Sequence, residues 1–166
     1  MRAQPFHIGH QKIINKMLQE CELVTVALGS IQEAYTEHNP FDFGTRQQMI
    51  ENVYRDSQEF NRLNICGIED INNPPRWGEY VLSCIKDYFS QDILPDVYYA
   101  GSEEDASLLK PYFAHTIIVD RNDKSFPYVS GTMVRDMIKQ KDNRWKNFVP
   151  FENHNLIEEY LYNTNN

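Results

Sequence analysis

The sequence predicts an α/β fold built on a doubly wound parallel sheet, and three observations lead to this class. Short apolar segments rich in Val and Ile alternate along the chain with amphipathic segments of helical period. The short segments are apolar at most positions, as strands are when helices cover both faces of a parallel sheet. Gly or acidic residues close these segments, at the sheet edge where ligands bind in such folds.

Each expected element follows from the spacing of its apolar residues. A helix carries them every three or four positions, as at Ile13, Met17 and Cys21, whereas a buried strand is a short continuous run such as VTVAL. Pro and Gly in the segments between them indicate loops. In chain order we expect a helix from near Gly9, a strand at 23–28, a helix around 49–54, a strand at 63–68, a helix around 81–89, a strand at 96–101, a helix at 104–112, a strand at 115–120, and helices at 130–138 and around 156–161.

The composition favours one domain that spans residues 1–166, with a frayed tail at about 163–166. The formal charge of −8 argues against a protein that binds nucleic acids or membrane surfaces through a basic field. No apolar segment reaches transmembrane length and no leader is visible, so we expect a cytoplasmic protein. We also expect a homo-oligomer. Three scattered cysteines without metal-ligand spacing fit reduced thiols.

The segment QPFHIGH places two histidines at the expected start of the first helix. His7 and His10 would lie in its first turn, where free backbone N–H groups and the helix dipole attract anions. Gly9 would let a ligand approach the backbone closely. The alternative is a pair of surface histidines that only cap a helix. The length of the motif favours a site for a phosphate chain.

The segment SGTMVR predicts a second anion site of the same kind. Ser130 or Thr132 can cap a helix, and Arg135 would lie about one turn inside it. Alone, this segment is an ordinary capped helix. Together with the histidine motif near the start of the chain, it predicts two helix N-termini that bind one polyphosphate.

Five segments in this order resemble the HIGH-motif nucleotidyltransferases, with the archaeal-type nicotinamide mononucleotide (NMN) adenylyltransferases as the best match: RAQPFHIGH, LGSIQ, NPFDFGTR, DVYYAGSEED and VSGTMVR. The resemblance extends from Arg2 to about Pro150. It implies a Rossmann-like fold of the nucleotidyltransferase type. It also implies transfer of AMP from ATP to NMN, or to nicotinic acid mononucleotide, with release of pyrophosphate. Mg²⁺ would be bound through the ATP phosphates and not by protein side chains.

The resemblance further implies roles for residues that match the family's motifs. His7, His10 and Arg135 are expected to be catalytic. The expected ATP site contains Arg2, Gln4, Phe6, Gly9, Gly101, Ser130 and Thr132. The expected mononucleotide site contains Gly29, Ser30, Arg46, Asp70, Asn73 and Trp77. Two of these have plainer interpretations: Trp77 as an anchor of its loop on the core, and Arg46 as an ordinary Arg in the first turn of an exposed helix.

The implied reaction matches the available side chains. A phosphate monoester is mostly dianionic at neutral pH, with a second pKa of about 6, so the nucleophile needs no general base. The reaction needs two anions held in line and stabilisation of charge on the phosphates, which His, Arg and helix N-termini provide. The alternatives are adenylyl or cytidylyl transfer to another phosphomonoester, and a catalytically weak nucleotide-binding regulatory module.

The sequence departs from the family pattern in three places. The family's opening strand is missing, and Met1 occupies the position of a Gly that precedes the Arg. We therefore expect that an N-terminal segment precedes Met1 in the natural protein, or that another strand fills the place. His38 and Asn39 replace a common Arg-Asp pair, which weakens the assignment of the second substrate, and GTR replaces GER.

Overall fold

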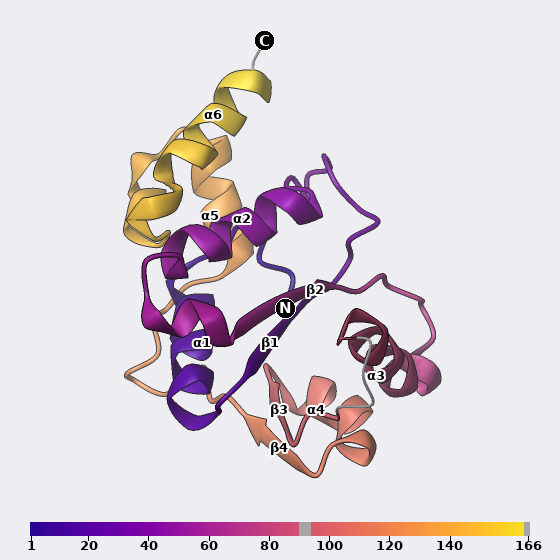
Figure 1. Cartoon of the computed structure of the whole chain (residues 1–166). Coiled ribbons are helices and arrows are strands. Elements are labelled where there is room, and N and C mark those ends of the chain that lie inside the picture. Colours follow the sequence, from indigo (N-terminus) through magenta and orange to yellow (C-terminus); the bar gives the residue numbers. More distant parts are fainter. Residues whose placement is uncertain (90–93, 165–166) are drawn as a thin grey trace.

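A computed structural model describes residues 1–89 and 94–164, and it confirms the alternation of strands and helices (Figure 1). Residues 165–166 of the expected frayed tail lie outside the described residues. The helices and strands are α1 (Ile8–Glu20), β1 (Val24–Leu28), α2 (Phe43–Tyr54), β2 (Leu63–Gly67), α3 (Pro74–Phe89), β3 (Val97–Ala100), α4 (Glu103–Leu109), β4 (His115–Ile118), α5 (Gly131–Lys139) and α6 (His154–Thr164). Short 3₁₀ helices, which the sequence did not predict, span Gln58–Arg62, Lys110–Tyr112, Asn143–Asn147 and Phe151–Asn153.

The strands are parallel, but within the described residues they do not form the single sheet that the sequence predicts. β1 pairs only with β2, and β3 pairs only with β4. Each pair is joined through a helix, as parallel neighbours require. The registers place Val24 opposite Leu63 and Leu28 opposite Gly67 in the first pair, and Val97 opposite His115 and Ala100 opposite Ile118 in the second.

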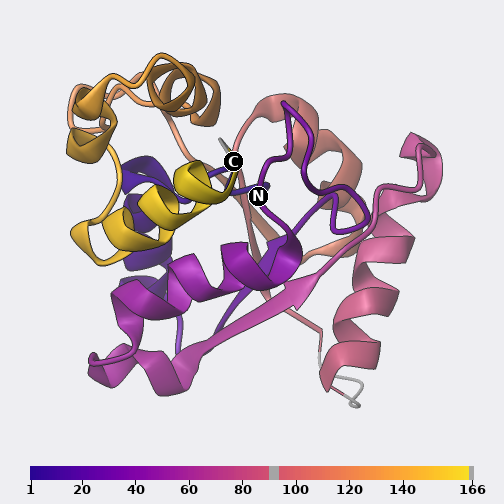
Figure 2. The same cartoon turned by 90° about the horizontal axis from the view of Figure 1, so that it is seen from above.

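Helices cover the strands from both sides. α1 and α2 lie on one side, α3 and α4 lie on the other, and α5 and α6 stack beyond α2 (Figures 1 and 2). The main core lies between the first strand pair and the helices α1, α2, α5 and α6. Its largest buried side chains include Phe6, Ile14, Phe41, Met49 and Ile157.

A second, smaller core lies between the other strand pair and α3 and α4. Its buried members are Ile68, Val81, Ile85, Leu109 and Phe113. The strands of this half are only partly covered: in β4 no residue is buried, and in β3 only the last residue is. The carboxyl ends of β1 and β3 nevertheless open toward the same edge, where the expected site residues follow the strands.

No described helix has the length and apolar content needed to cross a membrane. The three cysteines are free, and Cys66 is buried, which raises the pKa of its thiol to about 11. A thiol in that state is inert at neutral pH.

Candidate active site

The first turn of α1 is built from the HIGH motif. His7 is the N-cap, and its Nδ1 accepts from the backbone N–H groups of Gly9 at 3.2 Å and His10 at 3.4 Å. In turn, the Nδ1 atom of His10 accepts a hydrogen bond from the backbone N–H of His7 at 3.3 Å. The two histidines therefore form a reciprocal capping box, and the two rings stack with centroids 3.7 Å apart.

This hydrogen bonding fixes the chemistry of both imidazoles. Burial, reinforced by the charge of Arg121, lowers the pKa of His7 to about 4. Burial, with His7 and other positive groups, also holds the pKa of His10 well below its ordinary value. Both rings are therefore neutral at pH 7, and because each Nδ1 accepts, each proton resides on Nε2. The site thus offers two neutral N–H donors.

The N-terminus of α5 meets the segment before α1. Arg135 donates from Nη1 to the carbonyl of Gln4 at 2.7 Å. A Cβ added at Gly131 would lie 2.9 Å from the same carbonyl oxygen, and a Cβ at Gly9 would lie 3.1 Å from Val129. The backbone contact leaves no room for a side chain at Gly131, whereas at Gly9 an added Cβ would crowd the His7 ring, at 3.0 Å, as well as Val129.

Positive charge collects at this junction. Burial is the larger cause that lowers the pKa of Arg135, and the charge of Arg2 is the next. The two guanidinium groups therefore lie within electrostatic reach of each other. Arg135 also donates from Nη2 to the Thr132 hydroxyl at 3.1 Å, and Ser130 caps α5 through the N–H of Met133. Neither α1 nor α5 has an acidic residue in its first turn. The first N–H groups of α1 are not free as expected, because Ile8 donates to the Phe148 carbonyl and Gly9 and His10 donate to the His7 ring. An anion at α1 would therefore meet the helix dipole and the imidazole N–H groups.

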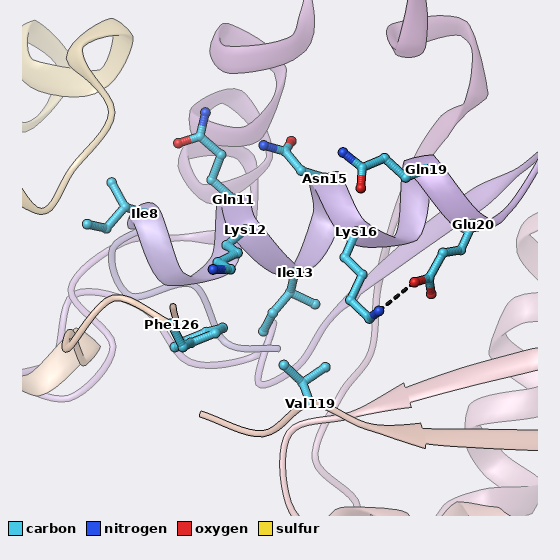
Figure 3. A pocket seen from close by; sticks show the side chains of 10 residues that line it. All are labelled: Ile8, Gln11, Lys12, Ile13, Asn15, Lys16, Gln19, Glu20, Val119 and Phe126. Carbon is cyan, nitrogen blue, oxygen red and sulfur yellow. Dashed lines mark hydrogen bonds and ion pairs between the residues drawn. The ribbon is translucent and has the colours of Figure 1, made fainter. Parts of the chain in front are cut away.

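The loop before α5 is fastened to α1. Lys12 donates to the backbone carbonyl of Ser125, and its Nζ lies 5.9 Å from the ring centroid of Phe126. Lys12 and Phe126 line a pocket of about 440 Å³ beside α1, which is also lined by the ion pair of Lys16 with Glu20 (Figure 3). This attachment sets the position of the α5 N-terminus relative to α1.

Two residues expected at the ATP site, Gln4 and Phe6, are buried. Gln4 bonds the backbone of Phe41 twice, donating to its carbonyl at 2.7 Å and accepting from its N–H at 2.9 Å. Phe6 is fully buried in the main core. Both hold the segment that carries Arg2 against the loop before α2.

Arg46 is also a support, and it is not exposed as its place in a first helical turn suggested. The residue is 0% exposed. Its guanidinium donates to four main-chain carbonyls, those of Arg2 at 2.9 Å, Gly29 at 2.8 Å, Asp42 at 3.2 Å and Ser30 at 3.4 Å. Arg46 therefore fixes the backbone behind the site, and little of its hydrogen-bonding capacity is left for a phosphate.

The ends of β1 and β2 form a second polar group of expected residues. Ser30, after Gly29, has a left-handed backbone with φ of 56° and donates its hydroxyl to the Asp70 carboxylate at 2.5 Å. Gln32 bonds both the N–H and the carbonyl of Asp70 at 3.2 Å. The exposed Asp70 is thereby held beside the end of β1.

The remaining residues of the expected mononucleotide site, Asn73 and Trp77, lie at the start of α3. Asn73 is exposed immediately before α3, where its carbonyl accepts from Arg76 at 3.0 Å. Trp77 is half-buried against the second core, and its ring lies 6.0 Å from that of Tyr80. This position corresponds to the interpretation of Trp77 as an anchor.

Sequence reasoning missed one cation. Arg121 follows β4, and a Cβ added at Gly101 would lie only 2.5 Å from its Nη2. After burial, its charge is one of the causes that lower the pKa values of His7 and His10, so it lies within electrostatic reach of both. The signal was available, because Arg121 follows an apolar strand in the same way as Gly29, Asp70 and Gly101.

Among residues 1–89 and 94–164, no group of three or more His, Cys, Asp or Glu side chains is placed to hold a metal ion. The donors at the junction are N–H groups and guanidinium groups, which bind anions.

The chain is similar in sequence to curated archaeal proteins. It is 34% identical over 164 residues to the nicotinamide-nucleotide adenylyltransferase of Caldivirga maquilingensis, covering 95% of this chain and 84% of that protein. It is 29% identical over 153 residues to the protein of the same name from Picrophilus torridus, covering 90% of this chain and 82% of that one.

Comparison with solved structures gives the same fold. A bifunctional NMN adenylyltransferase/ADP ribose pyrophosphatase from Francisella tularensis, in complex with AMP and a manganese ion, superposes with a TM-score of 0.69 at 19% identity. The match covers 99% of this chain and 51% of that one, so this chain spans about half of the bifunctional protein. The sequence profile of the cytidylyltransferase-like family matches residues 2–137. This chain, with its HIGH motif at the start of α1 and its SGTMVR motif at the start of α5, therefore belongs to the cytidylyltransferase-like family of nucleotidyltransferases.

Proposed function

We propose that this protein transfers AMP from ATP to NMN and produces NAD and pyrophosphate. The observation that carries the proposal is the meeting of two helix N-termini at the carbonyl of Gln4, with Arg2, Arg135, His7 and His10 around it. This arrangement suits a polyphosphate. The choice of NMN is supported by the names of the archaeal relatives.

The proposed reaction is a displacement at the α-phosphorus of MgATP. An oxygen of the NMN 5′-phosphate forms a bond to that phosphorus, and the bond to the bridging oxygen of the β-phosphate breaks. Pyrophosphate leaves with the electron pair. The attacking phosphate is mostly dianionic at neutral pH, so no side chain has to remove a proton.

The protein contributes position and charge. His7 and His10 donate from Nε2 to phosphate oxygens, and their fixed tautomer means that the donors are already in place when ATP arrives. Arg2 and Arg135 counter the charge of the triphosphate and of the leaving pyrophosphate. Ser130 and Thr132 add hydroxyls at the start of α5.

The mononucleotide is expected to bind at the ends of β1 and β2. There Gly29 and Ser30 lie beside Asp70, and the exposed Asn73 lies on the approach to α3. Hydroxyl, carboxylate and amide groups in this region can hydrogen-bond a ribose and a carboxamide. Trp77 is not assigned a stacking role, because its ring packs toward Tyr80 and the second core.

The direct test is to incubate the purified protein with ATP and Mg²⁺ and one phosphomonoester at a time, and to measure the dinucleotide and pyrophosphate formed. Turnover with NMN, at a rate above that with pantetheine phosphate or FMN, is the expected result. Turnover with another monoester but not with NMN would change the substrate. ATP binding without any turnover would support a regulatory module. CTP in place of ATP tests cytidylyl transfer.

A further inference from the structure

The loop that joins β4 to α5, residues 119–130, connects two parts of the site. It contains Arg121 near its start and ends at Ser130, the N-cap of α5. One turn further along α5 lies Arg135, which the proposed function assigns to the triphosphate. The path of this loop therefore decides where the α5 N-terminus lies relative to the histidines of α1.

Local hydrogen bonds give the loop its shape. The Asp120 carboxylate accepts from the N–H of Asn122 at 2.8 Å, and the Asp123 carboxylate accepts from the N–H of Ser125 at 2.6 Å. The carbonyl of Asp123 accepts from the N–H of Phe126 at 2.8 Å. Turns of this kind are stable over a few residues, but they do not determine where the loop sits on the rest of the protein.

Lys12 of α1 supplies the attachment that the loop itself lacks. Its Nζ donates to the carbonyl of Ser125 and, at 3.2 Å, to the hydroxyl of the same residue, and it lies 5.9 Å from the ring centroid of Phe126. Within the part of the chain that the structure describes, these two bonds are the ones that fasten residues 120–129 to a helix. One side chain thus holds the middle of the loop against α1 (Figure 3).

The attachment lies close to the histidine motif. Lys12 follows His10 by two positions on the same helix. Further along the loop, Val129 lies against Gly9, since a Cβ added at Gly9 would be 3.1 Å from its side chain. The loop therefore meets α1 at Lys12 and at Gly9, and a displacement at Ser125 would be transmitted over a few residues to the start of α5.

The other polar tie between these segments uses a group that the substrate also needs. Arg135 donates from Nη1 to the carbonyl of Gln4 at 2.7 Å. When this guanidinium turns toward a phosphate, its bond to Gln4 is weakened or lost. Lys12 directs its hydrogen bonds to the loop, so it can hold the loop in place while Arg135 binds the anion.

We propose that Lys12 is a positioning residue for ATP. It acts through the loop of residues 119–130 and does not touch the nucleotide. Its bonds to Ser125 keep the α5 N-terminus at the separation from His7 and His10 that a triphosphate spans. The identity of the ligand rests on the proposed function. Displacements of about 1 Å at such sites change rates and affinities strongly, so one loop attachment is enough to matter.

The test compares two lysines of the same helix. Lys12→Met keeps the apolar stem and removes the donor, whereas Lys16→Met does the same one turn further along, where the partner is Glu20 and not the loop. By calorimetry with MgATP, we expect the Kd to rise about fivefold or more for Lys12→Met and less than about twofold for Lys16→Met. Lys12→Arg retains a donor that can reach the Ser125 carbonyl and should restore the Kd to within about twofold of the wild type.

Two measurements separate positioning from a loss of stability. The bonds of Lys12 to Ser125 are exposed, so Lys12→Met should leave the melting temperature within about 3 °C of the wild type. The amide of Phe126, which is bonded inside the loop, should lose protection from hydrogen exchange by about threefold or more in Lys12→Met but not in Lys16→Met. An unchanged Kd or unchanged exchange in Lys12→Met would overturn the proposal.

A double-mutant cycle tests whether Lys12 acts through the loop. Phe126→Ala removes the ring beside Lys12. If both side chains act by holding the loop, the double variant should bind MgATP no more weakly than the weaker single variant. Independent effects that multiply would mean that Lys12 contacts the triphosphate itself, and would overturn the proposal.

Failure of this proposal can be distinguished from failure of the proposed function. ATP binding and hydrogen exchange require no turnover, so the comparison of the two lysines stands even if no monoester is adenylylated. Turnover with NMN that is accompanied by equal Kd values for Lys12→Met and Lys16→Met would overturn the role of Lys12 alone. A wild-type protein that binds no ATP would overturn both.

Discussion

The two strand pairs differ in how many of their residues are buried and in how many helices pack against them. β1 and β2 each have three buried residues, and their core includes residues of α1, α2, α5 and α6. β3 and β4 have one buried residue between them, and their core includes residues of α3 and α4. The first pair thus supports site residues that hydrogen bonds to the main chain hold in place. The second pair contributes Gly101 and Arg121, and fewer of its residues are buried. A cavity of about 620 Å³ is lined by β1 on one side and β3 on the other, and each of these strands pairs with one neighbour only among the described residues.

Arg46 offers the strongest test of rigidity in the first half. Arg46→Met keeps much of the side-chain length but leaves four buried or half-buried carbonyls without their donor, so we expect the free energy of unfolding to fall by about 4 kcal/mol. Urea denaturation measures it. Arg55→Met, at an exposed position after the same helix, is the matched control and should change stability by less than about 0.5 kcal/mol.

A second Arg variant sharpens the contrast between the halves. Arg121 is exposed, so Arg121→Met should leave the unfolding free energy near that of the wild type while raising the KM for ATP. Comparable destabilisation by both variants would contradict the view that only the first half is held by a buried cation.

The pH dependence of stability should carry the signature of His7. Its pKa in the folded state is about 4, against an ordinary value of 6.5, so between these values the unfolded chain binds a proton that the folded chain does not. The contribution of His7 to the free energy of unfolding is therefore fully present above about pH 6.5. It falls by about 3 kcal/mol as the pH decreases toward 4. His10 contributes in the same direction.

His7→Asn separates this titration from the cap. Asn accepts the same backbone N–H bonds at an N-cap but does not titrate. Denaturation at about pH 7 and about pH 4.5 should show a smaller loss in the variant than in the wild type. An unchanged pH slope would mean that the His7 ring is not buried as a neutral group.

These contacts also separate what the sequence could predict from what it could not. Local spacing placed α1 within one residue of its start and located all four strands, because apolar periodicity is a property of neighbours in the chain. The burial of Arg46 was missed, because its acceptors include Arg2 and Gly29, 44 and 17 residues away. The division into two strand pairs is likewise a matter of pairing between distant segments.

Within the site, both helix N-termini and their caps were predicted, and the charge state of the histidines was not. The capping residues are local, so Ser130 and His7 follow from the motifs themselves. The neutral imidazoles depend on burial by the rest of the fold. Gln4 and Phe6 were expected at the ATP site because the motif groups them with His7. In the structure both are buried, and Gln4 bonds the backbone of Phe41.

Removing one imidazole should affect the reaction more than the fold. His10→Ala deletes a donor to the phosphates, and we expect turnover to fall by about a hundredfold or more, as for loss of a transition-state contact. Steady-state kinetics with ATP and the preferred monoester measure it. His115→Ala is the matched control in the second half, since this histidine is exposed on β4, and it should keep full activity. A decrease of less than about threefold for His10→Ala would remove His10 from the proposed mechanism.

The smallest expected effect compares a glycine in each half. A Cβ at Gly78 in α3 would lie 2.3 Å from the Tyr112 ring and 2.9 Å from the Leu108 carbonyl, whereas a Cβ at Gly44 in α2 would meet only an Asp42 oxygen at 3.7 Å. Alanine improves helix propensity by about 1 kcal/mol at either position, but at Gly78 the backbone of Leu108 has to move, at a cost of about 2 kcal/mol. We therefore expect Gly78→Ala to lower the unfolding free energy by about 1 kcal/mol and Gly44→Ala to raise it by up to about 1 kcal/mol, as measured by urea denaturation. Stabilisation by both substitutions would mean that α3 and α4 separate easily, and that the second half is held together even more weakly than its small core suggests.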